Sequence, residues 1–105
     1  MADSLRFGDI VLLKFPFTDE TSFKKRPALV INDSKDGDII VCRITSQIHK
    51  TKQDVLIKEW ELAGLKLPST IRVHKIASLE KGMVEKIIGS INESTGIKVK
   101  KSLKV

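Results

Sequence analysis

The sequence predicts a small, mainly β domain that ends in one α-helix, and three observations lead to this prediction. Short apolar runs recur along the chain and are separated by Gly, Pro, Asn and Asp, a pattern typical of strands joined by tight turns. The chain has 105 residues, 41% of them hydrophobic and 30% charged, which is the composition of an ordered domain with one core. A helix-start signal lies near the C-terminus. We therefore expect one domain over residues 1–105.

The first three strands are expected in the N-terminal half. Residues 10–15 are apolar on both faces, so this strand should be central. Pro16 should end it, because proline cannot donate to a sheet ladder. Two further strands are expected over residues 26–31 and 38–44, separated by the turn residues of segment 32–37. Three short strands in series predict an antiparallel meander.

The C-terminal half predicts smaller elements and the helix. Residues 54–58 favour a strand, and residues 59–64 favour one helical turn closed by glycine. A short strand is expected near residues 83–85. Residues 90–93 (Ser-Ile-Asn-Glu) fit a capping box, so a helix should begin there and run to about Leu103.

One more strand, over residues 70–76, carries charged side chains in a regular pattern. Its period is two, which places Ile71 and Val73 on one face and Arg72 and His74 on the other. The apolar pair should face the core. An arginine and a histidine should therefore lie side by side on the outer face.

The charge balance favours a polyanionic partner. The formal net charge is +6, which suits nucleic acid first and an anionic membrane surface second. No apolar run approaches the roughly 20 residues needed to span a bilayer, and residues 1–9 lack the apolar region of a signal peptide. The single cysteine, Cys42, cannot form an internal disulfide and suits a reducing compartment. We expect a cytoplasmic protein without membrane contact.

Neither a metal nor an organic cofactor is expected. His49 and His74 lack the spacing of paired ligands, Cys42 stands alone, and no carboxylate cluster suggests magnesium. A phosphate-cradling glycine motif is also missing from the sequence. A nuclease built from this chain would have to use the ribose 2′-hydroxyl as nucleophile. That reaction needs a base, a proton donor for the leaving oxygen and positive charge on the phosphorane.

Several side chains have the right chemistry for these tasks, although each also has a simpler explanation. Arg26 follows two lysines at the start of an apolar run, and its guanidinium matches phosphate oxygens. Thr45 and Ser46 offer hydroxyls after a strand, where they could equally cap a turn. His74 carries an imidazole, the side chain that exchanges protons near neutral pH. The polar segment over residues 18–25 is expected to be a loop that joins the first strand to the next. The two lysines could therefore belong to a solvated loop end, and His74 could be an exposed strand residue.

Five ordered blocks of the sequence closely resemble the MazF/PemK toxin endoribonucleases of bacterial toxin–antitoxin pairs. The resemblance runs from about Phe7 to Ile91. The blocks are GDIV (8–11), FPFT (15–18), KRPALV (25–30), RITSQ (43–47) and GLKLPS (64–69).

The resemblance implies an SH3-like β-barrel of the MazF/CcdB type, assembled as a two-fold homodimer and bound by a cognate antitoxin protein. It implies metal-independent, sequence-specific cleavage of single-stranded RNA to a 2′,3′-cyclic phosphate and a 5′-hydroxyl. Arg26 and Thr45 match the catalytic pair of the family. RNA contacts are expected from Lys24, Lys25, Ser46, Gln47, His49 and Arg72.

The later strand departs from the family pattern. Some members use an arginine and an aspartate two residues apart, and this chain has Arg72 followed by His74. We expect His74 to act as the base, with Glu20 or Asp19 as the next candidates. Two other functions are compatible with the fold: a gyrase-poisoning toxin that binds a protein, and a nucleic-acid-binding barrel without catalysis.

Overall fold

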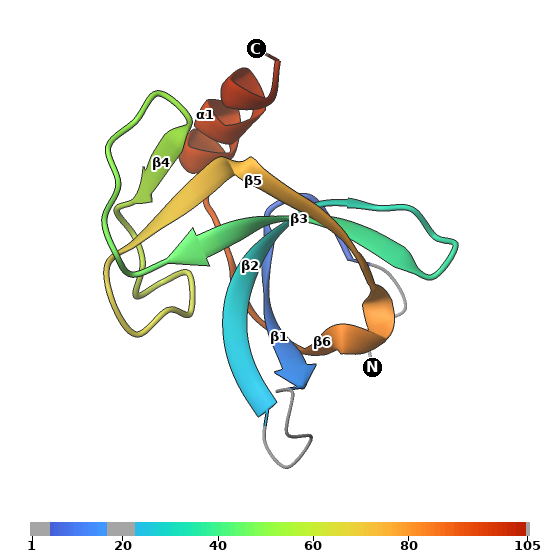
Figure 1. Ribbon diagram of the computed structural model, residues 1–105. Helices are drawn as coiled ribbons and strands as arrows, with labels where there is room; N and C mark the ends of the chain where they lie inside the picture. Colours follow the sequence, from blue (N-terminus) through green and yellow to red (C-terminus); the bar gives the residue numbers. More distant parts are fainter. Residues whose placement is uncertain (1–4, 17–22, 105) are drawn as a thin grey trace.

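The protein folds as one six-stranded antiparallel sheet with a C-terminal helix (Figure 1). The computed structural model describes residues 5–16 and 23–104. Neighbouring strands follow the order β4-β5-β3-β2-β1-β6. The elements are β1 (Asp9–Pro16), β2 (Phe23–Asp33), β3 (Asp38–Thr45), β4 (Asp54–Ile57), β5 (Ser69–Glu80), the 3₁₀ turn η1 (Lys81–Met83), β6 (Val84–Ser90) and α1 (Glu93–Leu103). The prediction of a mainly β fold with a C-terminal helix is confirmed.

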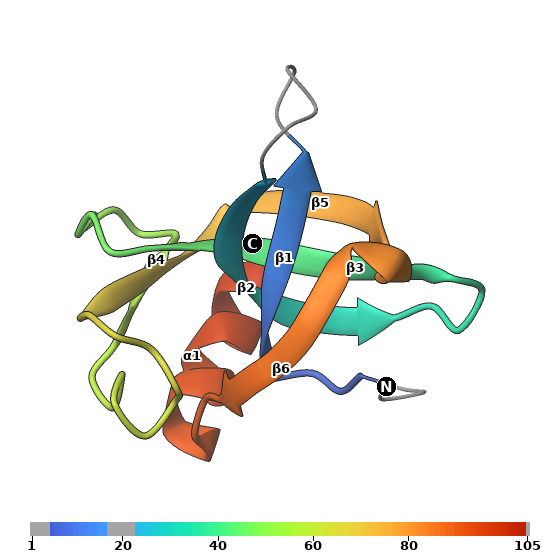
Figure 2. The ribbon, with the colours of Figure 1, turned by 90° about the horizontal axis from the view of Figure 1, so that it is seen from below.

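The sheet curls into a barrel because of one short connection. In the sheet order β5 and β6 are separated by β3, β2 and β1, yet η1 joins them directly. Only a strongly curved sheet can bring these strands together. Figures 1 and 2 show the strands wrapped around one another, with α1 lying to the side beside β4 and β5.

Two buried clusters lie on opposite faces of the central strands. Ile10 of β1 and Leu29 of β2 belong to the cluster beneath α1, which includes Val99 of the helix. Val11 and Val30, their chain neighbours, belong to the second cluster. Successive strand residues point to opposite faces, so β1 and β2 are apolar on both sides because both sides are covered. This confirms the central position predicted for the first strand.

Strand β5 bends sharply where it passes β3. Cys42 pairs with Ile76, but the next residue, Arg43, pairs with Arg72, so residues 73–75 stay outside the ladder. Hydrogen bonds hold this bulge, with the Val73 amide donating to the Gln53 carbonyl at 2.9 Å. The predicted strand over residues 70–76 is therefore the first part of a longer, bent strand. Bulges of this kind redirect side chains and occur next to functional sites.

Two predicted boundaries are wrong for identifiable reasons. Lys24 and Lys25 lie in β2 and not in a loop, because the pairing with β1 continues out to Phe23. The predicted capping box is not formed, since Ser90 ends β6. Asn92 caps α1 instead, and its side chain accepts a hydrogen bond from the Thr95 amide at 2.8 Å.

The turn segment before β5 is held against β6 by direct backbone contact. Residues 59–64 form turns, with one bond of helical type from the Ala63 amide to the Glu59 carbonyl, and Gly64 has φ +88°. A Cβ atom on Gly64 would overlap the Ile88 carbonyl, and one on Gly89 would overlap the Ala63 carbonyl. The glycines therefore permit an approach that no other residue allows.

Gly89→Ala should destabilise the fold by about 3 kcal/mol, because the added methyl group meets rigid backbone and β6 would have to move. Urea unfolding measures the effect. Gly82→Ala is the matched control, since a Cβ atom there has no neighbour within 4 Å. Equal midpoints for the two variants would contradict this account of the contact.

Candidate functional site

An open pocket of about 520 Å³ lies where β1, β2, β3 and β5 meet. Among the residues that the structure describes, four cationic side chains line it, from Lys24, Arg26, Arg43 and Lys75, and no acidic residue does. The rest of its lining is apolar apart from backbone, and comes from Leu13, Pro27, Ala28, Val41, Ile44, Ala77 and Leu79. The pocket therefore combines strong positive charge with an apolar floor.

The strand register explains why Arg26 faces this pocket. The β2–β3 pairing ends at Ala28 and Arg43, so Arg26 and Thr45 each lie two residues beyond the last pair. Residues two apart on a strand share a face. Arg26 therefore follows Ala28 to the pocket side, and it stays exposed there.

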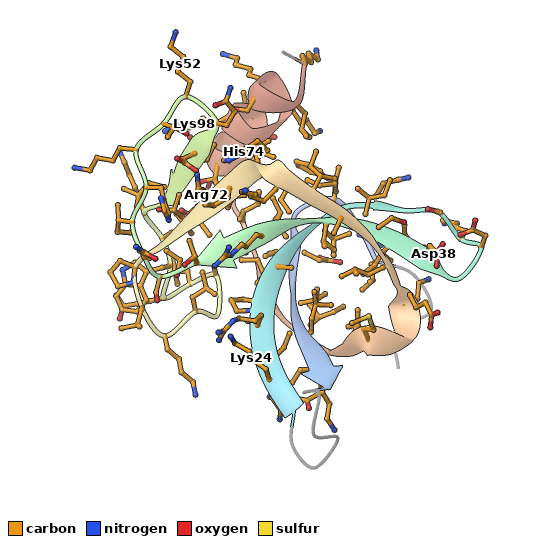
Figure 3. All side chains as sticks on the ribbon, viewed as in Figure 1. Lys24, Asp38, Lys52, Arg72, His74 and Lys98 are labelled. Carbon is orange, nitrogen blue, oxygen red and sulfur yellow. The ribbon has the colours of Figure 1, made fainter. Side chains whose placement is uncertain are left out.

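A second group of side chains surrounds Arg72 on the first half of β5. The Arg72 Nε donates to Asp54 Oδ1 of β4 at 2.9 Å. Its Nη1 lies 3.3 Å from His49 Nε2, and its Nη2 lies 3.3 Å from His74 Nε2. Figure 3 shows Arg72 and His74 together near the bend of β5, well away from Lys24. The prediction that Arg72 and His74 lie side by side is confirmed.

The hydrogen-bond roles in this group follow from the chemistry of arginine. A guanidinium can only donate, so both Nε2 atoms must accept. One arginine thus contacts two histidines, His49 from the β3–β4 connection and His74 from the bulge.

Asp54 anchors the group from behind. Its side chain is only 1% exposed and also accepts from the Thr51 amide at 2.8 Å and the Thr51 hydroxyl at 2.6 Å. Burial raises the pKa of the Asp54 carboxyl, but hydrogen bonds from Thr51 and Arg72 outweigh it and bring this pKa to about 2. Asp54 is therefore ionised at neutral pH and fixes the orientation of Arg72.

Comparison with known families identifies the chain. The model of the PemK-like, MazF-like toxins of type II toxin–antitoxin systems matches residues 6–105. The chain belongs to this family. No curated protein of similar sequence was found.

Solved structures of MazF proteins share the fold. A MazE–MazF complex from Deinococcus radiodurans contains a chain with a TM-score of 0.77 and 19% identity, covering 94% of this chain and 91% of that one. An endoribonuclease in complex with its cognate antitoxin from a mycobacterial species has a TM-score of 0.72 and 15% identity, covering 95% of this chain and 91% of that one. The Mycobacterium tuberculosis toxin MazF-mt6 has a TM-score of 0.71 and 15% identity, covering 89% of this chain and 91% of that one. These likenesses establish the MazF-like fold of the chain.

Within this MazF-like fold, the residues predicted for the site fall into separate places. Lys24 and Arg26 line the pocket, whereas His49, Arg72 and His74 form the histidine group. Lys25 is exposed and pairs with Glu85 at 3.0 Å. Asp19 and Glu20, the next candidates for the base after His74, lie outside the described residues.

The hydroxyl of Thr45 is engaged but still able to donate. Thr45 Oγ1 accepts a hydrogen bond from the Gln47 amide at 3.1 Å, so the turn-capping explanation describes its present contact. That bond uses a lone pair of the oxygen and leaves the O–H free to donate. Ser46 and Gln47 follow as exposed residues of the same turn.

Sequence reasoning missed three residues of the site: Arg43, Asp54 and Lys75. Arg43 and Lys75 line the pocket, and Asp54 anchors Arg72. Arg43 stands two residues before Thr45 and so shares its face, a signal that was available. Asp54 faces Arg72 only through the β4–β5 register, which the sequence does not reveal.

Two other chemistries find no support in the described residues. Cys42 is fully buried, and burial raises the pKa of its thiol to about 11, which opposes a nucleophilic role. In residues 5–16 and 23–104, no three His, Cys, Asp or Glu side chains are grouped to hold a metal ion. No helix in the same ranges is long and apolar enough to cross a membrane.

Asp54→Asn should lower the free energy of unfolding at neutral pH by on the order of 2 kcal/mol, because Arg72 loses its buried ionic partner. The folded-state pKa of Asp54 lies below the ordinary value of about 4, so its contribution is present above that value and is lost as the pH falls toward 2. The difference between variant and wild type should therefore shrink over this range. Urea unfolding at several pH values measures it, and a difference that does not depend on pH would contradict the assignment.

Proposed function

We propose that this MazF-like toxin is an endoribonuclease that cuts single-stranded RNA without a metal ion. The observation that carries the proposal is the pocket itself, whose lining in residues 5–16 and 23–104 gives Arg26 three cationic neighbours and no acidic one. Such a pocket suits the phosphate backbone of a single strand. The family and the MazF-like fold support the same activity.

The reaction proceeds by attack of a 2′-hydroxyl on its own 3′-phosphate. The 2′-oxygen forms a bond to phosphorus while its proton passes to a base. The bond from phosphorus to the 5′-oxygen breaks, and that oxygen takes up a proton. The products are a 2′,3′-cyclic phosphate and a 5′-hydroxyl, and no water molecule is consumed.

Arg26 and Thr45 suit the charge that builds up on the phosphorane. The Arg26 guanidinium is always charged and can donate two parallel hydrogen bonds to phosphate oxygens. The Thr45 hydroxyl still has its proton to donate, because its oxygen serves the Gln47 amide only as acceptor. Donors aimed at a developing charge supply the largest share of catalysis in many enzymes.

His74 is the proposed base. Its Nε2 lies 3.3 Å from Arg72 Nη2, and its side chain is exposed. A 2′-hydroxyl that displaces this long contact would meet the imidazole, the side chain that exchanges protons near neutral pH.

The proposed partners follow from the same surface and from the family. Relatives were crystallised with their antitoxins, and we assign this chain a cognate antitoxin, a homodimeric state and a cytoplasmic location. An acidic antitoxin segment would be attracted by the cations of the pocket.

Arg26→Ala should slow single-turnover RNA cleavage by about 100-fold, the effect of losing about 3 kcal/mol of phosphorane stabilisation. The variant should remain folded, because Arg26 is exposed. Lys66→Ala removes an exposed cation outside the pocket and serves as the control. Cleavage by Arg26→Ala at the rate of the control would refute the assignment.

His74→Asn should reduce cleavage by roughly 100-fold and flatten the acid limb of the pH–rate profile, since asparagine cannot accept the proton. His74→Asp should recover part of the rate, because a carboxylate can act as base. Single-turnover rates from pH 5 to 8 test both variants. If the acid limb of His74→Asn matches that of wild type, the base is a different residue.

A further inference from the structure

The pocket and the histidine group meet at two arginines placed directly opposite each other. Arg43 of β3 and Arg72 of β5 are register partners at the last point before the β5 bulge. Directly opposed residues of an antiparallel pair project from the same face with their Cβ atoms about 5 Å apart. Like charges in this position destabilise a sheet, so the pair calls for a compensating anion.

Within the described ranges 5–16 and 23–104, only Arg72 has such an anion. Asp54 neutralises Arg72 and is itself almost completely buried. Arg43 is exposed, and its side chain makes no hydrogen bond or ion pair to any residue in the described ranges 5–16 and 23–104. Of the two opposed arginines, Arg43 therefore has no anionic partner among the described residues.

The groups around the Arg43–Arg72 pair favour phosphate as the anion that would bind Arg43. Arg72 uses one N–H of Nη1 and one of Nη2 for the histidines, and each nitrogen carries a second N–H. Lys75 follows His74 in the bulge and lines the same pocket as Arg43. Hydrogen-bond donors with net positive charge thus lie near the Arg43–Arg72 pair on the pocket side and on the side of the histidine group.

We propose that Arg43 and Arg72 bind one phosphate group between them, forming a backbone subsite that joins the pocket to the histidine group. Asp54 is a positioning residue of this subsite, because it fixes the Arg72 guanidinium from behind. As a part of RNA recognition the subsite rests on the proposed function, and it would guide the strand across β3 and β5 from the Arg26 pocket to His74.

The salt dependence of RNA binding tests the subsite. The probe is a uniformly 2′-O-methylated 12-nucleotide RNA of random sequence, which cannot be cut because its nucleophile is blocked. For single strands each phosphate contact contributes about 0.7 to the slope of log affinity against log salt. Arg43→Gln should lower the slope by about that amount, and Arg43→Lys should restore it.

Lys35→Gln is the matched control, since it removes one exposed charge from the β2–β3 turn, at the other end of β3. Its slope should equal that of wild type. If the Arg43→Gln slope also equals that of wild type, Arg43 contacts no phosphate and the proposal is overturned.

A second measurement uses inorganic phosphate and needs no RNA. At fixed pH and ionic strength, with chloride as the balancing anion, phosphate should shift the ring-proton NMR signals of His49 and His74 in a saturable manner. Wild type and Lys35→Gln should respond alike, and Arg43→Gln should require at least about tenfold more phosphate. An equal response of Arg43→Gln would overturn the proposal.

Failure of the phosphate subsite and failure of the proposed nuclease activity give different results. Saturable phosphate binding by a protein that leaves RNA intact would keep the subsite and reject the proposed nuclease. RNA cleavage by wild type, with Arg43→Gln unchanged in both measurements, would keep the nuclease and reject the subsite.

Discussion

The ion pair between Arg72 and Asp54 is the interaction on which the arrangement of the site depends. Arg72 reaches His49 from the β3–β4 connection and His74 from the bulge of its own strand. Its third contact, to the buried Asp54, comes from the other side. A guanidinium is planar and rigid, so fixing its Nε end also fixes the directions of both Nη atoms. Without the carboxylate, one flexible side chain would have to position two imidazoles by itself. The desolvation of such a pair is costly, which is why Thr51 supplies two further hydrogen bonds to Asp54.

The curvature of the sheet determines which cations share a surface. Arg26, Arg43 and Lys75 come from β2, β3 and β5 and are far apart in the sequence, but they line one pocket because β5 continues past β3 after its bulge. The bulge sends consecutive residues in different directions, so that His74 contacts Arg72 while Lys75 lines the pocket. The positive charge of the chain is therefore concentrated by topology. A surface of this kind attracts a polyanion over a distance of about one Debye length and orients it on arrival.

Local patterns predicted much of the fold, and long-range pairing explains what they missed. The alternation of residues 70–76 placed Arg72 and His74 correctly side by side, because strand periodicity is a local property. Lys24 and Lys25 were misplaced in a loop, since their strand character depends on pairing with β1. Asn92 replaces Ser90 as the helix cap because β6 extends further than its sequence suggests. Asp54 could not be assigned a role, because its partner lies across a strand pair that a long connection separates. Residues that depend on register are the ones that sequence alone does not place.

The most direct measurement concerns the ends produced on RNA. Purified protein is incubated with a long single-stranded RNA in excess EDTA, and the new termini are identified by mass spectrometry. Attack by the ribose 2′-hydroxyl predicts cleavage in EDTA, with a 2′,3′-cyclic phosphate on one fragment and a 5′-hydroxyl on the other. RNA that stays intact, or fragments that carry a 3′-hydroxyl and a 5′-phosphate, would contradict the proposed chemistry of the Arg26 pocket.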